Sequence, residues 1–133
     1  MELHYLQESD ISFLCNLYRY PVSLVQASVL YHQLQKTHSL AMFVDNRFVG
    51  IIEFFPVKEG TYEIGYRTCF QEQGKGFMKQ GVGLCKKLCK EYGVKRLIAR
   101  VVENNIASIR ILEYNGFLQE VNNDGVLLYV YDC

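Results

Sequence analysis

The chain has 133 residues, of which 50% are hydrophobic and 21% are charged, and its fourteen basic and fourteen acidic residues cancel. This length and this hydrophobic content suit a single globular domain, residues 1–133, with a core of its own. A net charge of zero provides no long-range field for a nucleic acid or an anionic membrane surface, so neither is expected as a partner.

The cysteines and the apolar runs bear on where the protein works. No apolar run approaches the roughly 20 residues that cross a bilayer, and the first residues lack a basic region followed by an apolar core, so we expect a cytoplasmic protein. The five cysteines are then reduced and are expected to be small buried side chains. Cys85 and Cys89 are four residues apart and could share a metal, but no second pair stands at ligand spacing, so no metal is expected.

The first part of the chain predicts a strand and a pair of helices. Residues 3–6 alternate as a strand does, and Ser9 or Asp10 caps a helix that ends at Pro21. Ser23 caps a second helix that extends to about residue 36.

Three strands are predicted next. Residues 40–44 and 48–55 are β-rich and flank a turn at Asp45-Asn46-Arg47, so they should pair antiparallel. Residues 56–60, from Pro56 to Gly60, form the next turn, and residues 62–70 form the third strand.

The rest of the chain alternates between helices and strands. A helix ends at Gly93, residues 95–102 form a strand, residues 105–114 a short helix, and residues 117–121 and 126–131 the last strands. The order β-α-α-β-β-β-α-β-α-β-β is of the α+β class and requires a mixed sheet with one parallel crossover. The helix before Gly93 is expected to place its apolar face at Phe77, Gly81, Leu84, Cys85, Leu88 and Tyr92.

The junction between the third of these strands and the following helix contains Gly74 and Gly76. Glycine lets the main chain pass close to a ligand, and the first turn of a helix offers unpaired N–H groups at its positive end. We interpret the junction as a pyrophosphate cradle, and an ordinary glycine-rich turn is the alternative. Because Gly76 is followed by Phe77-Met78-Lys79, the junction is neither a Walker loop nor a dinucleotide fingerprint.

The spacing Gln71-x-x-Gly74-x-Gly76 at a strand-to-helix junction resembles the acyl-CoA-binding motif of the GNAT superfamily of N-acetyltransferases. The predicted order of elements is also that of the GNAT fold, whose mixed, mostly antiparallel sheet is splayed at the cofactor site. The resemblance implies an enzyme that transfers an acetyl group from acetyl-CoA to a primary amine of a small molecule, a peptide or a protein.

A second segment supports this resemblance. Asn105-x-x-Ser108, followed by Gly116-Phe117, matches the family's Asn-x-x-Ser…Gly-Phe signature and looks most like the branch with the ribosomal-protein N-terminal acetyltransferases. The first helical region is shorter here than is usual in that branch, so a ribosomal-protein substrate is not implied.

The resemblance also implies which residues bind acetyl-CoA. Backbone amides of residues 74–78 would hold the pyrophosphate, with Gln71 beside them, and the pantetheine arm would pair with residues 66–70. A free backbone N–H in that strand would polarise the thioester oxygen. The residues expected to bind the cofactor are Tyr66, Cys69, Phe70, Gln71, Gly74, Lys75, Gly76, Phe77, Met78, Asn105 and Ser108.

The general acid departs from the family pattern. Many GNAT enzymes have a tyrosine four residues after the serine of the second motif, and here Leu112 occupies that position. Tyr114 lies about 200° further around the helix and should not reach the same point. We therefore expect Ser108 to protonate the departing thiolate, with a purely structural serine as the alternative.

A general base must remove a proton from the amine near neutral pH. Glu63 is the candidate because it begins a Glu-Ile-Gly-Tyr run that is common in the resembled branch, and a structural ion pair is the alternative. Glu53, which lies in a strongly apolar run, is the reserve.

The acceptor and the partners are less constrained. In this fold the first helical pair and the last hairpin select the acceptor, and exposed edge strands make a homodimer plausible. Two other functions stay open: a catalytically silent module that binds acyl-CoA, and an interaction domain that keeps only the scaffold. The residues that would face the acceptor are Tyr18, Tyr20, Pro21, Tyr31 and Asn122 to Gly125.

Overall fold

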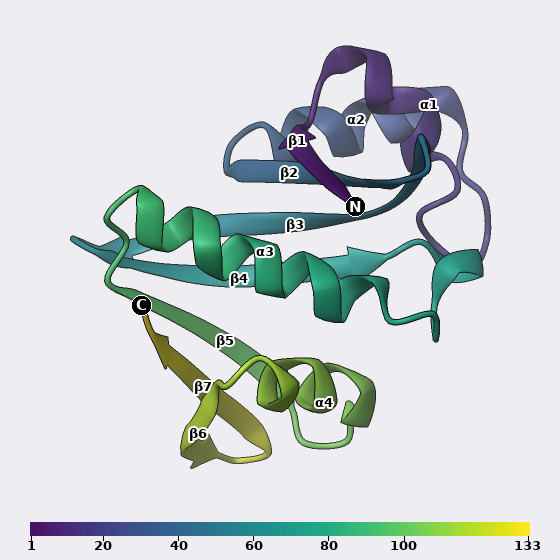
Figure 1. Ribbon diagram of the computed structural model, residues 1–133. Coiled ribbons are helices and arrows are strands. Elements are labelled where there is room, and N and C mark those ends of the chain that lie inside the picture. Colours follow the sequence, from purple (N-terminus) through teal and green to yellow (C-terminus); the bar gives the residue numbers. More distant parts are fainter. The chain divides into compact units, whose positions relative to one another are not determined.

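A computed structural model describes all residues, 1–133 (Figure 1). None of its helices is long and apolar enough to span a bilayer. The elements, in chain order, are β1 (Glu2–Tyr5), the 3-10 helix η1 (Glu8–Asp10), α1 (Ile11–Leu14), α2 (Leu24–Leu34), β2 (His38–Val44), β3 (Arg47–Lys58), β4 (Thr61–Thr68), the 3-10 helix η2 (Phe70–Glu72), α3 (Phe77–Glu91), β5 (Arg96–Val102), α4 (Ile106–Tyr114), β6 (Leu118–Asn123) and β7 (Val126–Asp132).

The seven strands form one sheet in the order β1-β2-β3-β4-β5-β7-β6. β4 and β5 are parallel and pair Thr61–Glu63 with Arg96–Ile98, whereas β1 with β2, β2 with β3, β5 with β7 and β6 with β7 are antiparallel. A parallel pair needs a crossover connection, and α3 lies in the segment that connects β4 to β5. The predicted class, order of elements and mixed sheet are confirmed.

Two compact units make up the chain. The first comprises residues 1–54 and 66–81, and the second comprises residues 55–65 and 82–133. β3, β4 and α3 each run through both units.

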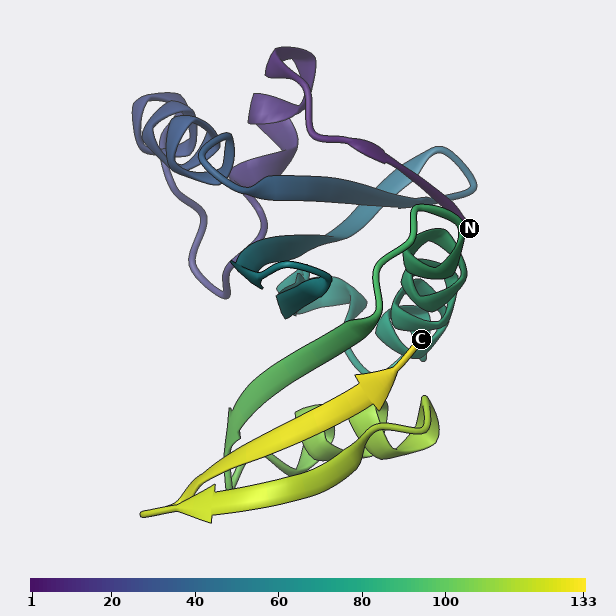
Figure 2. The ribbon, with the colours of Figure 1, turned by 90° about the vertical axis from the view of Figure 1, so that its left-hand side faces the viewer.

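In the first unit, helices cover both faces of the strands (Figure 2). Ala41 of β2 and Ile51 of β3 are buried with α1 and α2 in one apolar cluster. The next residue on each strand, Met42 or Ile52, points to the opposite face because side chains alternate along a strand. Gly81 of α3 lies on that face, where an added Cβ would come within 3.0 Å of Met42. The small residue therefore lets α3 approach the strands closely.

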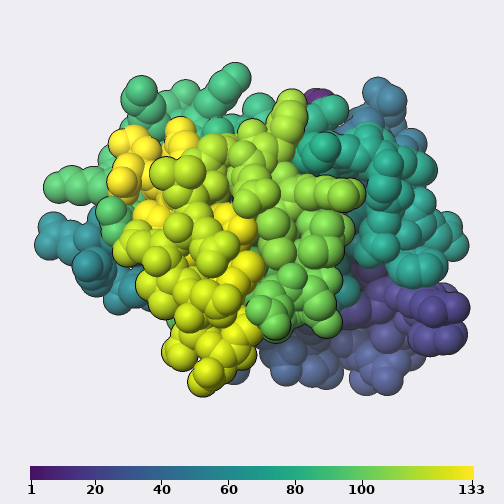
Figure 3. Space-filling model, turned by 90° about the horizontal axis from the view of Figure 1, so that it is seen from below, coloured from purple at the N-terminus to yellow at the C-terminus, as the bar shows by residue number.

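In the second unit, the core lies between α4 and the strands β5 and β7. Leu97, Leu112, Phe117 and Tyr129 are almost completely buried there. Figure 3 shows the side chains of α4 beside those of β6 and β7. Lys86 joins α3 to the end of α4, because its Nζ donates to the carbonyl of Asn115 at 2.6 Å.

The prediction of a helix that continues to Pro21 is wrong, because the observed helix is shorter. α1 ends at Leu14, after which the amides of Cys15 and Asn16 donate to carbonyls three residues back and the chain leaves the α-helical path. The Asp10 carboxylate accepts from the N–H of Gln7 and makes no side-chain cap for α1. Ser23, in contrast, caps α2 as predicted.

Two strand ends also differ from expectation. β3 continues through Pro56 to Lys58, so the turn predicted from Pro56 shrinks to Glu59 and Gly60. β4 ends at Thr68, two residues early, because the backbone enters the 3-10 helix η2. The sequence favours ending β3 at Pro56, because a proline lacks the N–H that donates a hydrogen bond to a neighbouring strand.

The predicted apolar face of α3 is rotated from the buried one. Gly81 and Cys85 are buried as expected, but Tyr92 is 80% exposed. The other residues of α3 that are buried are Met78, Val82 and Cys89. The predicted face and the buried face overlap at Gly81 and Cys85 in the middle of the helix, and the packing of α3 determines which face is buried.

Candidate active site

The glycine turn between β4 and α3 has a left-handed backbone at both of its glycines. Gly74 and Gly76 have φ of +77° and +80°, a region that favours glycine. A Cβ built on either residue meets no atom within 4 Å. The two glycines are therefore required by backbone conformation and not by crowding, and the space beside them is open. The first N–H groups of α3, which begins at Phe77, have no acceptor within the helix.

The segment before the turn is hydrogen-bonded to neighbouring elements. The N–H of Cys69 donates to Val49 of β3 at 2.8 Å, and the N–H of Phe70 donates to Leu17 at 3.1 Å. These two amides, which lie in the stretch predicted to pair with pantetheine, thus have acceptors within the chain.

Cys69 itself is a packing residue. Its side chain is buried and its Sγ lies 3.9 Å from the carbonyl oxygen of Phe48. Burial, with the nearby charge of Glu72 as a smaller cause, raises the pKa of the Cys69 thiol to about 11. The thiol is therefore protonated at neutral pH and is not a nucleophile.

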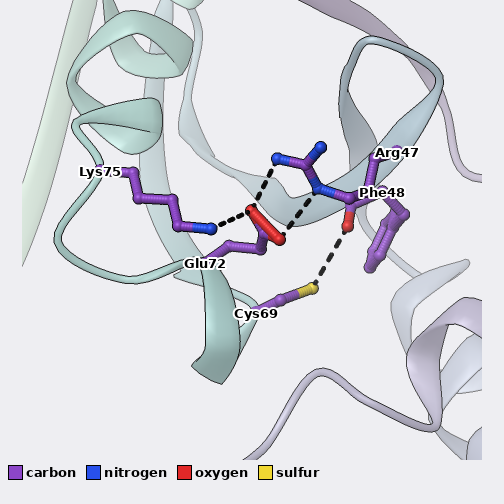
Figure 4. Close-up of polar contacts among 5 residues, drawn as sticks. All are labelled: Arg47, Phe48, Cys69, Glu72 and Lys75. Carbon is purple, nitrogen blue, oxygen red and sulfur yellow. Dashed lines mark hydrogen bonds and ion pairs between the residues drawn. The ribbon is translucent and has the colours of Figure 1, made fainter.

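An ion-pair network stands at the start of the turn (Figure 4). The Glu72 carboxylate accepts from Nε and Nη2 of Arg47 at 2.9 and 3.1 Å, and from Nζ of Lys75 at 3.3 Å. The hydrogen bonds from Arg47 are the main cause that lowers the pKa of Glu72. Arg47 follows a turn in which Asp45 and Asn46 have φ of +49° and +62°, so the predicted hairpin turn is confirmed and aims Arg47 at the end of β4.

A cavity of about 310 Å³ opens beside this network. Its wall combines stacked aromatic rings, three amide side chains and the paired charges of Arg47 and Glu72. The lining residues are Phe13, Asn16, Asn46, Arg47, Phe48, Cys69, Gln71 and Glu72.

Asn105 and Ser108, of the second motif, lie in the second unit. Asn105 is the N-cap of α4, and its Oδ1 accepts from the N–H of Ser108 at 3.2 Å. Leu112, which stands where the family pattern implies a tyrosine, is completely buried, and Tyr114 is 71% exposed. As expected from the helical angle, Tyr114 does not take the place of residue 112.

Glu63 is paired with Arg100 of the neighbouring strand. Nη2 of Arg100 donates to Oε1 of Glu63 at 2.8 Å, and the Glu63 side chain is 23% exposed. This is the ion pair that the sequence leaves open as the alternative to a catalytic base. Tyr66, also predicted at the site, lies three residues further along β4 and is half-buried.

Glu53 lies on β3, where its Oε2 accepts from the Thr37 hydroxyl at 3.5 Å. Its carboxyl is half-buried, and burial raises its pKa, which the Thr37 hydrogen bond partly offsets. A carboxyl of this kind binds a proton more readily than an exposed one.

The cysteines of α3 fit the packing interpretation. Cys85 and Cys89 are buried, and burial raises the pKa of both thiols. No group of three or more His, Cys, Asp or Glu residues that could hold a metal ion is found. The expectation of buried cysteines is wrong for Cys133, which is exposed, and Cys15 is only half-buried.

Sequence reasoning missed the Arg47–Glu72 pair. The sequence pattern indicates only a turn at Arg47, and 25 positions separate Arg47 from Glu72. No local spacing links them, because the pairing depends on how β3 lies beside the end of β4.

Known proteins are similar to this chain in sequence or in fold. The profile of the family described as acetyltransferase (GNAT) domain matches residues 5–118. The probable N-acetyltransferase YjcK of Bacillus subtilis is 32% identical over 80 residues, which cover 57% of this chain and 44% of that protein. The match thus spans less than half the length of this curated relative.

Two solved structures show the likeness in fold. Ribosomal-protein-alanine N-acetyltransferase from Brucella melitensis has a TM-score of 0.76 at 15% identity, with 100% of each chain covered. Spermidine N-acetyltransferase from Vibrio cholerae, in complex with CoA and spermine, has a TM-score of 0.78 at 16% identity, with 98% of this chain and 94% of that chain covered. With the profile match over most of its length, the chain belongs to the acetyltransferase (GNAT) family.

Proposed function

We propose that this protein transfers the acetyl group of acetyl-CoA to a primary amine of a small molecule, a peptide or a protein. The observation that carries the proposal is the glycine turn. Gly74 and Gly76 adopt positive φ at the start of α3, with open space where side chains would be. A pyrophosphate fits there because the helix N-terminus offers N–H donors and a positive dipole end.

The cofactor would be held mainly by the main chain. Amides of Gly74, Lys75, Gly76, Phe77 and Met78 would bind the pyrophosphate, with Gln71 beside them. Tyr66, Cys69 and Phe70 would flank the pantetheine arm, and Asn105 and Ser108 are proposed as further cofactor-binding residues.

The thioester supplies an electrophilic carbonyl carbon and a thiol leaving group. We propose that the N–H of Thr68 polarises the carbonyl oxygen, because the amides of Cys69 and Phe70 already have acceptors within the chain.

Proton transfer is assigned to two side chains. Glu63 would take the proton from the attacking amine and Ser108 would give one to the departing thiolate. The pairing of Glu63 with Arg100 would orient its carboxylate. Glu53 is the reserve base, because its raised pKa favours proton uptake.

We further infer a cytoplasmic protein whose partners are acetyl-CoA and an amine, without nucleic acid or membrane. Spermine in the Vibrio structure is itself an amine. β1 and β6 are the edge strands of the sheet, and either edge would allow a homodimer. The rival function, a silent acyl-CoA-binding module, is favoured by Leu112 in place of a tyrosine. Release of CoA on addition of amines distinguishes the two.

The cradle is tested by calorimetric titration of Gly76→Asp with acetyl-CoA. The variant places a carboxylate against the pyrophosphate, so binding should fall at least about 100-fold. Gly93→Asp is the matched control, because Gly93 has φ of +78° and no atom within 4 Å of an added Cβ, but lies at the other end of α3. Both variants carry the same strain of about 1–2 kcal/mol. Equal affinities in the two variants would refute the cradle.

A further inference from the structure

Glu72 carries a negative charge and lies directly before the glycine turn, which is proposed to bind an anion. Its side chain is only 12% exposed, and both carboxylate oxygens accept hydrogen bonds. Arg47 and Lys75 are about half exposed, at 51% and 48%. The cluster of the three residues therefore has one excess positive charge, which faces solvent.

The turn after Glu72 has few contacts of its own. Residues 73–76 are exposed, and the two glycines among them have no neighbour within 4 Å of a built Cβ. Glycine is also the residue with the greatest conformational freedom in an unconstrained chain. The nearest fixed point before the turn is Glu72, which Arg47 joins to the start of β3 through two parallel hydrogen bonds.

The two cations have different attachments. Arg47 engages both oxygens of Glu72, whereas Lys75 adds one longer contact of 3.3 Å. Lys75 stands between the glycines, so it can leave Glu72 without releasing the carboxylate from Arg47.

We propose that Arg47 and Glu72 are positioning residues: their ion pair fixes the glycine turn before the cofactor arrives and frees Lys75 to contact a phosphate oxygen. The inference rests on the proposed function, since it presumes that the turn binds acetyl-CoA. A turn that is ordered in advance binds more tightly because the ligand does not have to order it. An unpaired Glu72 would instead repel the phosphates.

The test is a double-mutant cycle on CoA affinity, measured by calorimetric titration of the wild type, Arg47→Met, Glu72→Gln and the double variant. Positioning predicts that each single change weakens binding about fivefold and that the double change is no worse, because either change removes the same pair. Charge effects alone predict the opposite for Glu72→Gln, which would bind CoA more tightly. That result, or additive effects, would overturn the proposal.

A second readout separates positioning from general damage. S-acetylpantetheine lacks the pyrophosphate, so its kcat/KM as acetyl donor should be equal in all four proteins, whereas kcat/KM for acetyl-CoA should fall. Arg47→Lys keeps the charge but not the two parallel hydrogen bonds, and should give an intermediate affinity for CoA. Arg96→Met breaks an exposed pair with Asp132, at 2.8 Å, and is the matched control that should leave CoA affinity unchanged.

Amide hydrogen exchange of residues 73–77, measured without ligand, tests independently of the proposed function whether the Arg47–Glu72 pair orders the turn. Faster exchange in Glu72→Gln than in Arg96→Met supports the proposal that the ion pair orders the turn, and equal exchange refutes it. If wild type fails to bind CoA, the proposed function falls while exchange still decides whether the pair orders the turn.

Discussion

Ser108 shows how one residue can hold a structural and a chemical role through different atoms. The N–H of Ser108 donates to Oδ1 of Asn105, the N-cap of α4, and this hydrogen bond does not involve the Ser108 hydroxyl. Ser108→Ala therefore keeps the cap and removes only the side-chain oxygen.

If Ser108 is the general acid, Ser108→Ala should lower kcat about 10- to 100-fold and should have little effect on the affinity for CoA, which the main chain of the glycine turn is proposed to hold. Steady-state kinetics with a primary amine, together with calorimetric titration of CoA, checks the expectation. Unchanged kcat with a lowered melting temperature would instead make the hydroxyl structural.

At the scale of single elements, two helices share the same kind of start. Asn105 caps α4 through its side-chain oxygen, and Ser23 caps α2 with Gln26 in a reciprocal capping box. Each cap satisfies an N–H that the helix itself leaves without an acceptor.

Asn105→Ala and Ser23→Ala should each reduce the free energy of unfolding by about 1 kcal/mol. Of these two residues, only Asn105 is predicted to bind the cofactor, so only Asn105→Ala should also weaken CoA binding. Urea unfolding and CoA titration of both variants provide the comparison. Equal CoA affinity in the two variants would leave Asn105 with the cap as its only role.

At the scale of the whole molecule, we propose that the two units fold as a single domain. β3, β4 and α3 are continuous through both units, so neither unit can lose these elements without breaking the other. We expect calorimetry to record one transition, with an enthalpy of about 90 kcal/mol for 133 residues. The calorimetric and van't Hoff enthalpies should agree. Two separated transitions would mean that the units unfold independently.

The sequence by itself determined the features that depend on near neighbours. The order of helices and strands, the hairpin turn at Asp45 and Asn46, the cap at Ser23 and the glycine-containing turn before α3 all follow from residues a few positions apart. Such features are local because hydrogen bonds and steric limits within a turn fix them. For the same reason the motifs were sufficient to indicate the family.

Only the tertiary structure decided which distant side chains meet. Arg47 contacts Glu72 across 25 positions, and Arg100 contacts Glu63 across 37. Both contacts depend on strand order and register, which spacing along the chain does not encode. The buried face of α3 is a similar case, because Val82 and Cys89 are buried whereas Leu84 and Leu88 of the predicted face are only half-buried. Long-range packing, which a single sequence pattern leaves open, settled these three points.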